Sequence, residues 1–239
     1  NAQANDNTPI ITFVNLQLSK EADVASAVPG GFINYTLHYT NTNNKINIGA
    51  GLKGNLSSYT SYDARFTYSL FDSLNYYVID YSGNNQIYNR FDVVYDNTSL
   101  LQVSGQLKHQ LREKFHLLAK GNYYLYKPKN LIRPYHRPDF DLTFSGIYNL
   151  KSKFILRADL FIMGNQWALT RHNEGGTIVM KPKLLNGWGD LNLECEYRYS
   201  KTLGFFLRFN NLAGQRYYRW ERYPSQRFSM MAGLSFVPF

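Results

Sequence analysis

The side chains able to do acid–base or metal chemistry are scattered through this sequence. None of the five histidines stands at metal-ligand spacing from another histidine or from the single cysteine, Cys195. No Gly-x-Ser-x-Gly elbow occurs, and Ser104 with His109 or His116 lacks any positioned base or oxyanion donor that the sequence can name. We therefore expect no catalytic residue, no metal site and no cofactor, and we interpret the chain as a non-enzyme.

A second group of charged residues stands at alternating positions and suits ligand contacts better than catalysis. These residues are Asp139, Asp141, Arg157, Asp159, Glu194, Glu196 and Arg198. We expect the first four to form a ladder of charges across adjacent segments, with neutralisation between strands favoured over a substrate site. In the intervening segments, Arg133, Arg137 and Arg171 are expected to hold lipopolysaccharide phosphates or an anionic ligand through bidentate contacts.

The segments that carry these residues alternate between apolar and polar positions, which indicates half-apolar strands. Ten such spans are expected, at 10–18, 32–41, 45–55, 99–110, 114–126, 139–150, 153–164, 189–200, 203–211 and 227–239. Residues 56–98 alternate only in places, and the pattern fits either two to four further strands or a surface hairpin that rises above the membrane. A span of about nine to eleven residues crosses a bilayer when it is tilted by about 45°.

The composition of the two strand faces favours a membrane barrel over a soluble β-sandwich. Charged residues make up only 18% of the chain, and the polar faces carry mostly Asn, Ser, Gln, Thr and Gly opposite faces rich in Tyr and Phe. No apolar run reaches the length of a transmembrane helix. We predict an all-β, antiparallel transmembrane β-barrel with about 10–14 strands visible, its polar face toward a wet lumen. Residues 1–239 would form one such domain or a fragment of a larger barrel.

The connections between the spans are short and long in turn. Short polar turns are expected at 41–44, 112–113, 151–152 and 201–202, and long loops at 127–138, 165–189 and 213–225. This asymmetry is typical of outer-membrane barrels. Tyrosines and tryptophans gather at strand ends and in one loop, and we expect their rings at the headgroup level. They are Tyr123, Tyr124, Tyr126, Trp167, Trp188, Tyr217, Tyr218, Trp220 and Tyr223.

The net charge of +9 is spread along the strands and turns. Because no basic helix or patch gathers it, we expect no nucleic-acid partner. A basic lumen or contact with anionic headgroups fits the scatter better.

The C-terminal third carries a family resemblance. The run from Leu185 to Pro224, together with Tyr135-His-Arg-Pro138, resembles the C-terminal strands of TonB-dependent receptor-like outer-membrane barrels. The resemblance implies the outer membrane of a Gram-negative bacterium and a barrel-assembly signal at Gly233, Phe236 and Phe239. This ending is one residue longer than the Gly-x-x-aromatic-x-Phe that is common in the family. The family's plug domain and TonB box are not found here, so we interpret the chain as a fragment of such a barrel or as a small relative without active transport.

Three functions stay open at this point. The first is a receptor-like or porin-like barrel that mediates solute uptake or passage. The second is a scaffold barrel that binds a partner protein or lipoprotein, and the third is a soluble β-barrel for an apolar ligand. For the membrane alternatives, the expected partners are outer-membrane lipid and lipopolysaccharide, the barrel-assembly machinery, and partner outer-membrane proteins or lipoproteins. The pattern names no substrate.

Overall fold

The computed structural model describes residues 10–13, 24–26, 35–37, 42–79, 91–112, 114–151 and 153–236, the first three segments by backbone alone. The strands are β1 (Ile10–Phe13), β2 (Val24–Ser26), β3 (Tyr35–Leu37), β4 (Asn43–Ser57), β5 (Thr60–Ile79), β6 (Phe91–Leu111), β7 (Phe115–Pro128), β8 (Phe140–Leu150), β9 (Phe154–Met163), β10 (Gln166–Glu174), β11 (Thr177–Leu185), β12 (Trp188–Arg198), β13 (Leu203–Asn210), β14 (Tyr218–Trp220), β15 (Tyr223–Pro224) and β16 (Ser229–Phe236). Among the described residues, no helix is long and apolar enough to cross a bilayer.

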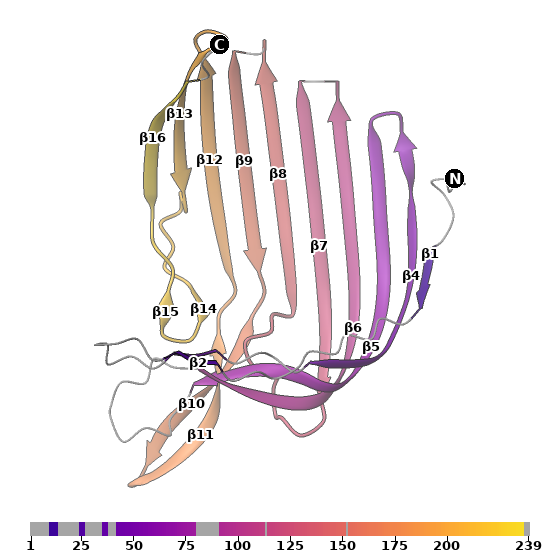
Figure 1. The fold of residues 1–239 in the computed structure, drawn as a ribbon, viewed down its shortest axis with the longest axis vertical. Coiled ribbons are helices and arrows are strands. Elements are labelled where there is room, and N and C mark those ends of the chain that lie inside the picture. The colour runs from indigo at the N-terminus through magenta and orange to yellow at the C-terminus, as the bar shows by residue number, and fades with distance from the viewer. Residues whose placement is uncertain are drawn as a thin grey trace.

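Ten of the strands form one antiparallel sheet in the order β1-β4-β5-β6-β7-β8-β9-β12-β13-β16. The strands stand side by side as a curved wall (Figure 1). Within the described residues, β1 and β16 each pair along one edge only, so the sheet is an arc and not a closed barrel. The all-β, antiparallel fold agrees with the sequence prediction.

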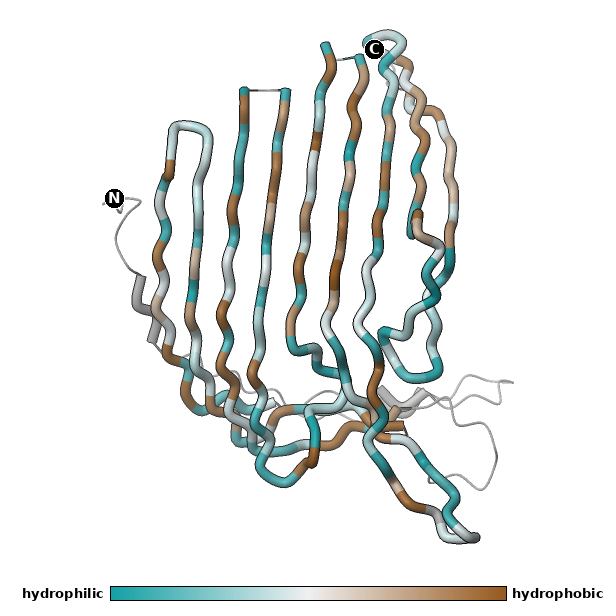
Figure 2. Tube along the Cα trace, turned by 180° about the vertical axis from the view of Figure 1, so that it is seen from behind, coloured by the Kyte–Doolittle hydropathy of each residue, from teal (hydrophilic) through white to brown (hydrophobic). Residues whose placement is uncertain are grey.

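The alternation in the sequence sorts side chains onto two faces of this sheet. Leu193 lies opposite Ala158, and the next residue, Glu194, lies opposite Arg157. Apolar and polar positions therefore alternate along each strand (Figure 2). On the apolar face, side chains such as Leu52, Phe66, Val103, Phe144, Leu156 and Leu234 are between 43% and 68% exposed. No second layer of the described chain covers this face, which a soluble sheet would have to bury.

The sequence pattern of residues 56–98 fits either further strands or a surface hairpin, and their described part combines both features. It holds one further long strand, β5, whose far end pairs with the start of β6 as a hairpin after a register shift between Phe71 and Leu74.

Three other expectations were wrong. The segment 165–189 is not an open loop but the hairpin β10–β11, which turns at Gly175 and Gly176 in left-handed conformations. The described part of 32–41, β3, pairs with β2 and not with the large sheet. Asn43 and Asn44, expected in a turn, begin β4.

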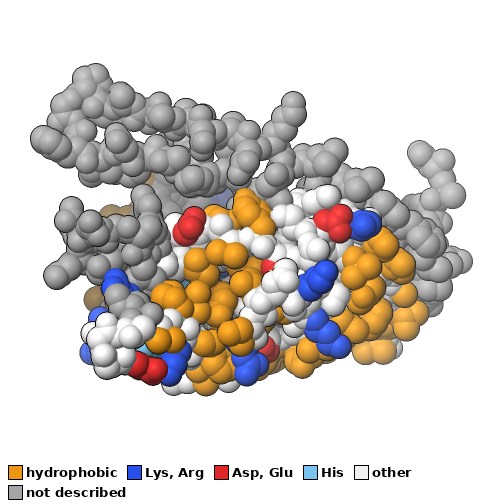
Figure 3. Space-filling view, turned by 90° about the horizontal axis from the view of Figure 1, so that it is seen from below, with side chains coloured by type: hydrophobic (Ala, Val, Ile, Leu, Met, Phe, Trp, Pro, Cys, Tyr) orange, Lys and Arg blue, Asp and Glu red, His pale blue; other side chains and the backbone are white. Residues whose placement is uncertain are grey.

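The most buried side chains lie beyond one end of the large sheet. We call this region the loop cap: the far ends of β5 and β6 (72–79 and 91–98), residues 129–139, β10–β11 and β14–β15. β6 pairs with β7 only from Thr98 onward, so the ends of β5 and β6 project as a hairpin that crosses below the sheet (Figure 1). Tyr76 is fully buried there, and its hydroxyl lies 2.8 Å from Thr98 Oγ1. The cap also exposes apolar side chains on its outer surface (Figure 3).

One carboxylate ties the strands of the cap to its loop. Asp96, only 3% exposed, accepts hydrogen bonds from the backbone N–H groups of Asn130 and Leu131, both at 2.8 Å, and from Asn130 Nδ2 at 2.7 Å. The loop is thereby held against β6.

Replacing this carboxylate tests that coupling. We expect Asp96→Ala to lower the free energy of unfolding by about 3 kcal/mol, because three donors lose their acceptor. Urea unfolding followed by tryptophan fluorescence measures the change. Asp92→Ala is the control, since Asp92 is exposed and, among the described residues, accepts from the N–H of Val93 at 2.8 Å. Equal losses in the two variants would contradict the role of Asp96.

Candidate functional site

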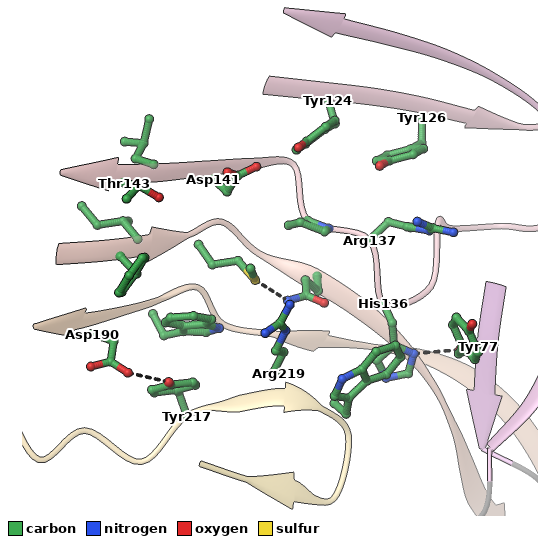
Figure 4. Close-up of a pocket in the computed structure, with 18 of the residues that line it drawn as sticks. Tyr77, Tyr124, Tyr126, His136, Arg137, Asp141, Thr143, Asp190, Tyr217 and Arg219 are labelled. Atoms are coloured by element: carbon green, nitrogen blue, oxygen red, sulfur yellow. Dashed lines mark hydrogen bonds between the residues drawn. The ribbon is translucent and has the colours of Figure 1, made fainter. Parts of the chain in front are cut away.

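A cavity of about 1020 Å³ lies between the polar face of the sheet and the loop cap. Figure 4 shows most of its lining, which comes from β5, β6, β7, β8, β9, β10, β12, β14 and the adjoining loops. Seven of its side chains are large aromatics: Tyr77, Tyr124, Tyr126, Phe161, Trp188, Tyr217 and Trp220. Tyr124 and Tyr126 stand two positions apart on β7, so both rings point to the polar face, and they stack with centroids 5.9 Å apart.

The second aromatic pair is fixed by a carboxylate. The rings of Trp188 and Tyr217 stack at 4.0 Å with an angle of 11°, and the Tyr217 hydroxyl donates to Asp190 Oδ2 at 2.7 Å. Burial, with the Asp190 carboxylate beside it, raises the pKa of Tyr217 to about 12, so the phenol stays protonated. Within the described part of the chain, Trp188 Nε1 and Asp190 Oδ1 are buried without a protein hydrogen-bond partner. One donor and one acceptor behind the wall are therefore left unsatisfied by it.

Two guanidinium groups line the cavity and differ in how they are held. Arg137 donates to the backbone oxygen of Asn75 at 2.8 Å and to Asn75 Oδ1 at 3.0 Å, and it lies 5.9 Å from the ring of Tyr76. Arg219 has no ion-pair partner among the described residues and extends toward the middle of the lining (Figure 4). The site therefore presents at least one cation available to an anionic ligand.

His136 joins three parts of the cap. It is 7% exposed, Nδ1 lies 2.7 Å from the carbonyl oxygen of Tyr77, and Nε2 accepts the N–H of Glu221 at 3.3 Å. Because Nε2 is an acceptor, Nδ1 carries the proton and the ring is neutral. The imidazole stacks on Trp220 at 5.0 Å. Burial lowers the pKa of His136, against the opposing effects of the Tyr77 carbonyl and the Glu221 carboxylate.

The charge ladder expected from the sequence does not form. Asp141 accepts from Asn122 Nδ2 at 2.9 Å, and Asp139 lies just before β8, outside the lining of the cavity. Asp159 lies opposite Asn192, and Arg157 pairs instead with Glu194 at 3.2 Å. The register explains the difference, because these carboxylates fall on different rungs of the sheet.

The other charged candidates of the polar face pair among themselves. Glu194 binds Arg157 on one side and Arg208 on the other, with Arg208 Nη2 at 2.6 Å, so its charge is compensated twice. Glu196 and Arg198, two positions apart on β12, pair at 2.7 Å. Of the seven predicted contact residues, only Asp141 lines the large cavity, and the predicted ligand contacts of the others stay predictions.

The predicted anion-binding arginines are not brought together. Arg133 lies over the ring of Trp167 at 4.5 Å, and Arg137 lines the cavity. Arg171 lies on the β10–β11 hairpin. In the proposed assembly signal, Gly233 leaves room for Phe206, whose ring would lie 2.5 Å from an added Cβ, and Phe236 is 70% exposed. Phe239 lies outside the described residues.

Sequence reasoning missed the aromatic lining. Tyr124, Tyr126, Trp188, Tyr217 and Trp220 were expected at the headgroup level, yet they line the cavity. Parity carried the signal for three of them, because Tyr124 and Tyr126 share a face with Asn122, and Trp188 shares one with Asn192 on β12. No such signal existed for Tyr217 and Trp220, whose positions depend on how the cap folds.

This arrangement suits binding of a ligand. It combines flat aromatic walls, protonated phenols and a guanidinium with few competing carboxylates. In the part of the chain that the structure describes, no three His, Cys, Asp or Glu side chains are grouped to hold a metal ion.

Comparison with known proteins identifies the fold. No protein-family model and no curated protein matches the sequence. Among solved structures, the ferripyoverdine receptor of the Pseudomonas aeruginosa outer membrane, bound to ferripyoverdine, is 12% identical with a TM-score of 0.62, over 82% of this chain and 27% of that one. The ferric-catecholate import receptor Fiu from E. coli is 13% identical with a TM-score of 0.59, over 95% and 32%.

A further match is the siderophore receptor PirA from Acinetobacter baumannii, 10% identical with a TM-score of 0.60, over 82% of this chain and 32% of that one. The chain has the fold of these outer-membrane receptor barrels. It spans about a quarter to a third of the length of the receptors that it matches.

The buried imidazole predicts a pH dependence of stability. The folded pKa of His136 lies below its ordinary value of 6.5. As the pH falls below 6.5, the unfolded chain therefore binds a proton that the folded chain does not, and the free energy of unfolding decreases by up to about 1.4 kcal/mol per pH unit. This contribution is fully present above that pH.

Unfolding curves between about pH 8 and pH 5 measure the slope. We expect His136→Asn to lose most of it, and His172→Asn to keep it, because His172 is exposed on β10. A wild-type slope in His136→Asn would show that another group causes it.

Proposed function

We propose that this chain forms part of a receptor-like barrel in the outer membrane of a Gram-negative bacterium and takes part in the uptake of a solute. The observation that carries the proposal is the cavity of about 1020 Å³ under the loop cap, on the polar face of a sheet with a receptor-barrel fold. The cavity would receive the solute at the long-loop rim, where outer-membrane barrels meet the outside of the cell.

The apolar face of the sheet supports the membrane location. Its large side chains are exposed along the whole wall, and leucine or phenylalanine at such positions is favourable only against lipid or another protein. The polar face carries paired charges and amides, which suit a water-filled interior. We therefore assign the polar face to the lumen.

The open edges support the view that the described sheet is an arc of a larger barrel. Unpaired N–H and C=O groups cost several kcal/mol each in hydrocarbon, so a lipid-exposed sheet must close. The edges of β1 and β16 would be completed by further strands. The chain would thus be one portion of a barrel and not a barrel by itself.

The lining favours an anionic solute with aromatic or other planar groups. Trp188 and Tyr217 provide a stacked face, and Arg219 provides charge. Ferric siderophore complexes have this character, and solved structures of the same fold include a receptor bound to ferripyoverdine. We take ferric siderophores as the first candidates.

A scaffold function is the second candidate, and the outer surface of the cap favours it. Exposed apolar side chains lie there on the 129–139 loop, β11, β14 and β15: Ile132, Met180, Leu184, Tyr218 and Tyr223, between 38% and 74% exposed. Such residues suit contact with a partner protein or lipoprotein. Solute binding distinguishes the two functions.

Adjacent residues on β12 test the membrane location. We expect a spin label at Leu193→Cys to collide with membrane-dissolved oxygen far more often than a label at Glu194→Cys, because the first faces lipid and the second the lumen. Electron paramagnetic resonance of the reconstituted protein measures the collision rates, and Cys195→Ser removes competing labelling. Equal rates would refute the lipid-facing assignment.

Arg219 tests the solute site. We expect Arg219→Gln to weaken binding of ferripyoverdine or of a ferric tris-catecholate about tenfold, through loss of a charged hydrogen bond. Quenching of tryptophan fluorescence measures the affinity. Arg216→Gln is the matched control, since Arg216 is exposed in the same loop but does not line the cavity. Binding of neither chelate to the wild type would favour the scaffold function.

A further inference from the structure

The short-turn rim of the sheet carries a row of cations. Turns at 112–114, 151–153 and 199–202 join successive long strands at the end opposite the loop cap (Figure 1). Five exposed basic side chains stand in them: Arg112, Lys114, Lys151, Lys153 and Lys201. Glu113 is the acidic residue of these turns in the sequence. Within the described residues, none of the five has an ion-pair partner.

The choice of residues in two of these turns runs against backbone preference. Arg112 and Lys151 adopt left-handed conformations with φ of 53° and 51°. Glycine or asparagine would adopt them at lower cost. The sequence thus places a cation where a smaller residue would fit the turn better.

Aromatic rings lie on the apolar face directly beside these turns. Phe154, Tyr197 and Phe205 stack across three neighbouring strands, with centroids 4.6 and 6.5 Å apart. Phe115 and Tyr148 form a further pair at 6.5 Å. Rings of this kind settle where hydrocarbon meets the headgroups. The cations one to four residues away along the chain then stand at the level of the lipid phosphates.

Three of the cations also converge on a hollow. Lys151, Lys153 and Lys201 line a space of about 620 Å³ between the β8–β9 and β12–β13 turns, which a hydrogen bond from Arg198 N to Lys153 O at 2.7 Å holds together. Arg198 and Glu196 line it too and neutralise each other. Because these two residues belong to the polar face, the hollow lies on the lumen side of the rim. It keeps a net positive charge there, while the turns themselves carry the lysine side chains at the level of the aromatic rings.

Several cations of the opposite rim have partners. Lys183 pairs with Glu221, Lys181 with Glu174, and Arg133 lies over Trp167. The first of these contacts joins β11 to the β14–β15 turn. The five cations of the short-turn rim have no such ion pair within the described residues.

From this combination of unpaired cations and an adjoining aromatic band, we propose that the short-turn rim binds the phosphates of anionic phospholipids in the leaflet that it faces. The group bound at this rim is a lipid phosphate and not a soluble phosphate. The aromatic rings mark the depth at which the acyl chains end, so the adjacent cations stand where lipid headgroups lie. The inference rests on the membrane location proposed above. It requires no bound solute.

The test counts lipids retained by the protein in nanodiscs of about equal parts dioleoylphosphatidylglycerol and dioleoylphosphatidylcholine. Native mass spectrometry reads the number of phosphatidylglycerol molecules that stay bound. We expect Lys151→Gln/Lys153→Gln to weaken this retention by about fivefold per lysine removed. Lys127→Gln/Lys129→Gln, an equal charge change near the long-loop rim, should retain phosphatidylglycerol as the wild type does.

Two further arms keep the outcome decisive. Lys151→Arg/Lys153→Arg keeps the charge and should bind as the wild type does, which separates loss of charge from loss of folding. Inorganic phosphate at equal concentration should displace no lipid. Unchanged retention in the glutamine variant, or displacement by inorganic phosphate, would overturn the proposal. Failure of the Leu193 label to meet oxygen would instead overturn the membrane location.

Discussion

Strand pairing is the constraint on which the rest of this structure depends. The large sheet exposes leucine and phenylalanine along one face, and in the proposed membrane location its backbone polar groups could not rely on water on that side. Every interior strand meets the demand by pairing along both edges, in registers that run without interruption through β6, β7, β8, β9 and β12. The same registers fix which side chains share the polar face, and therefore which charges can meet there.

The polar face resolves its charges mainly by local pairing. Glu194 lies between Arg157 and Arg208 of the neighbouring strands. Asp63 accepts hydrogen bonds from Nε and Nη2 of Arg65, both at 2.8 Å. Each pair connects positions that are adjacent in register or two apart on one strand, as side-chain reach requires. Such pairing compensates the charges of the wall and fixes its register. The large cavity lies instead beside the loop cap, where the chain no longer follows the repeating strand ladder.

The sequence predicted the large sheet much better than the loop cap, because side chains along a strand alternate with a period of two residues and those of the cap follow no period. Alternation alone predicts that Leu193 and Glu194 lie on opposite faces of their strand. Most strands, their two faces and most short turns could therefore be predicted from the local sequence pattern. His136 illustrates the opposite case. Its role depends on Tyr77 and Glu221, which lie 59 and 85 residues away along the chain. The same limit explains why the predicted charge ladder was wrong. The alternation gives the face on which Asp141 or Asp159 lies, but it does not give the register with the neighbouring strand.

The two ends of the sheet differ in their side chains because they are stabilised in different ways. At the short-turn end, tight turns fix their residues through backbone geometry, so side chains such as Lys151 and Lys201 need no internal partner. At the other end, the long connections are not held by pairing with the large sheet, so they depend on a separate set of buried side chains. Buried polar groups such as Asp96 and His136 specify that core, because each is satisfied in only one arrangement. A cavity with fixed aromatic walls is consequently found beneath the cap and not at the turns.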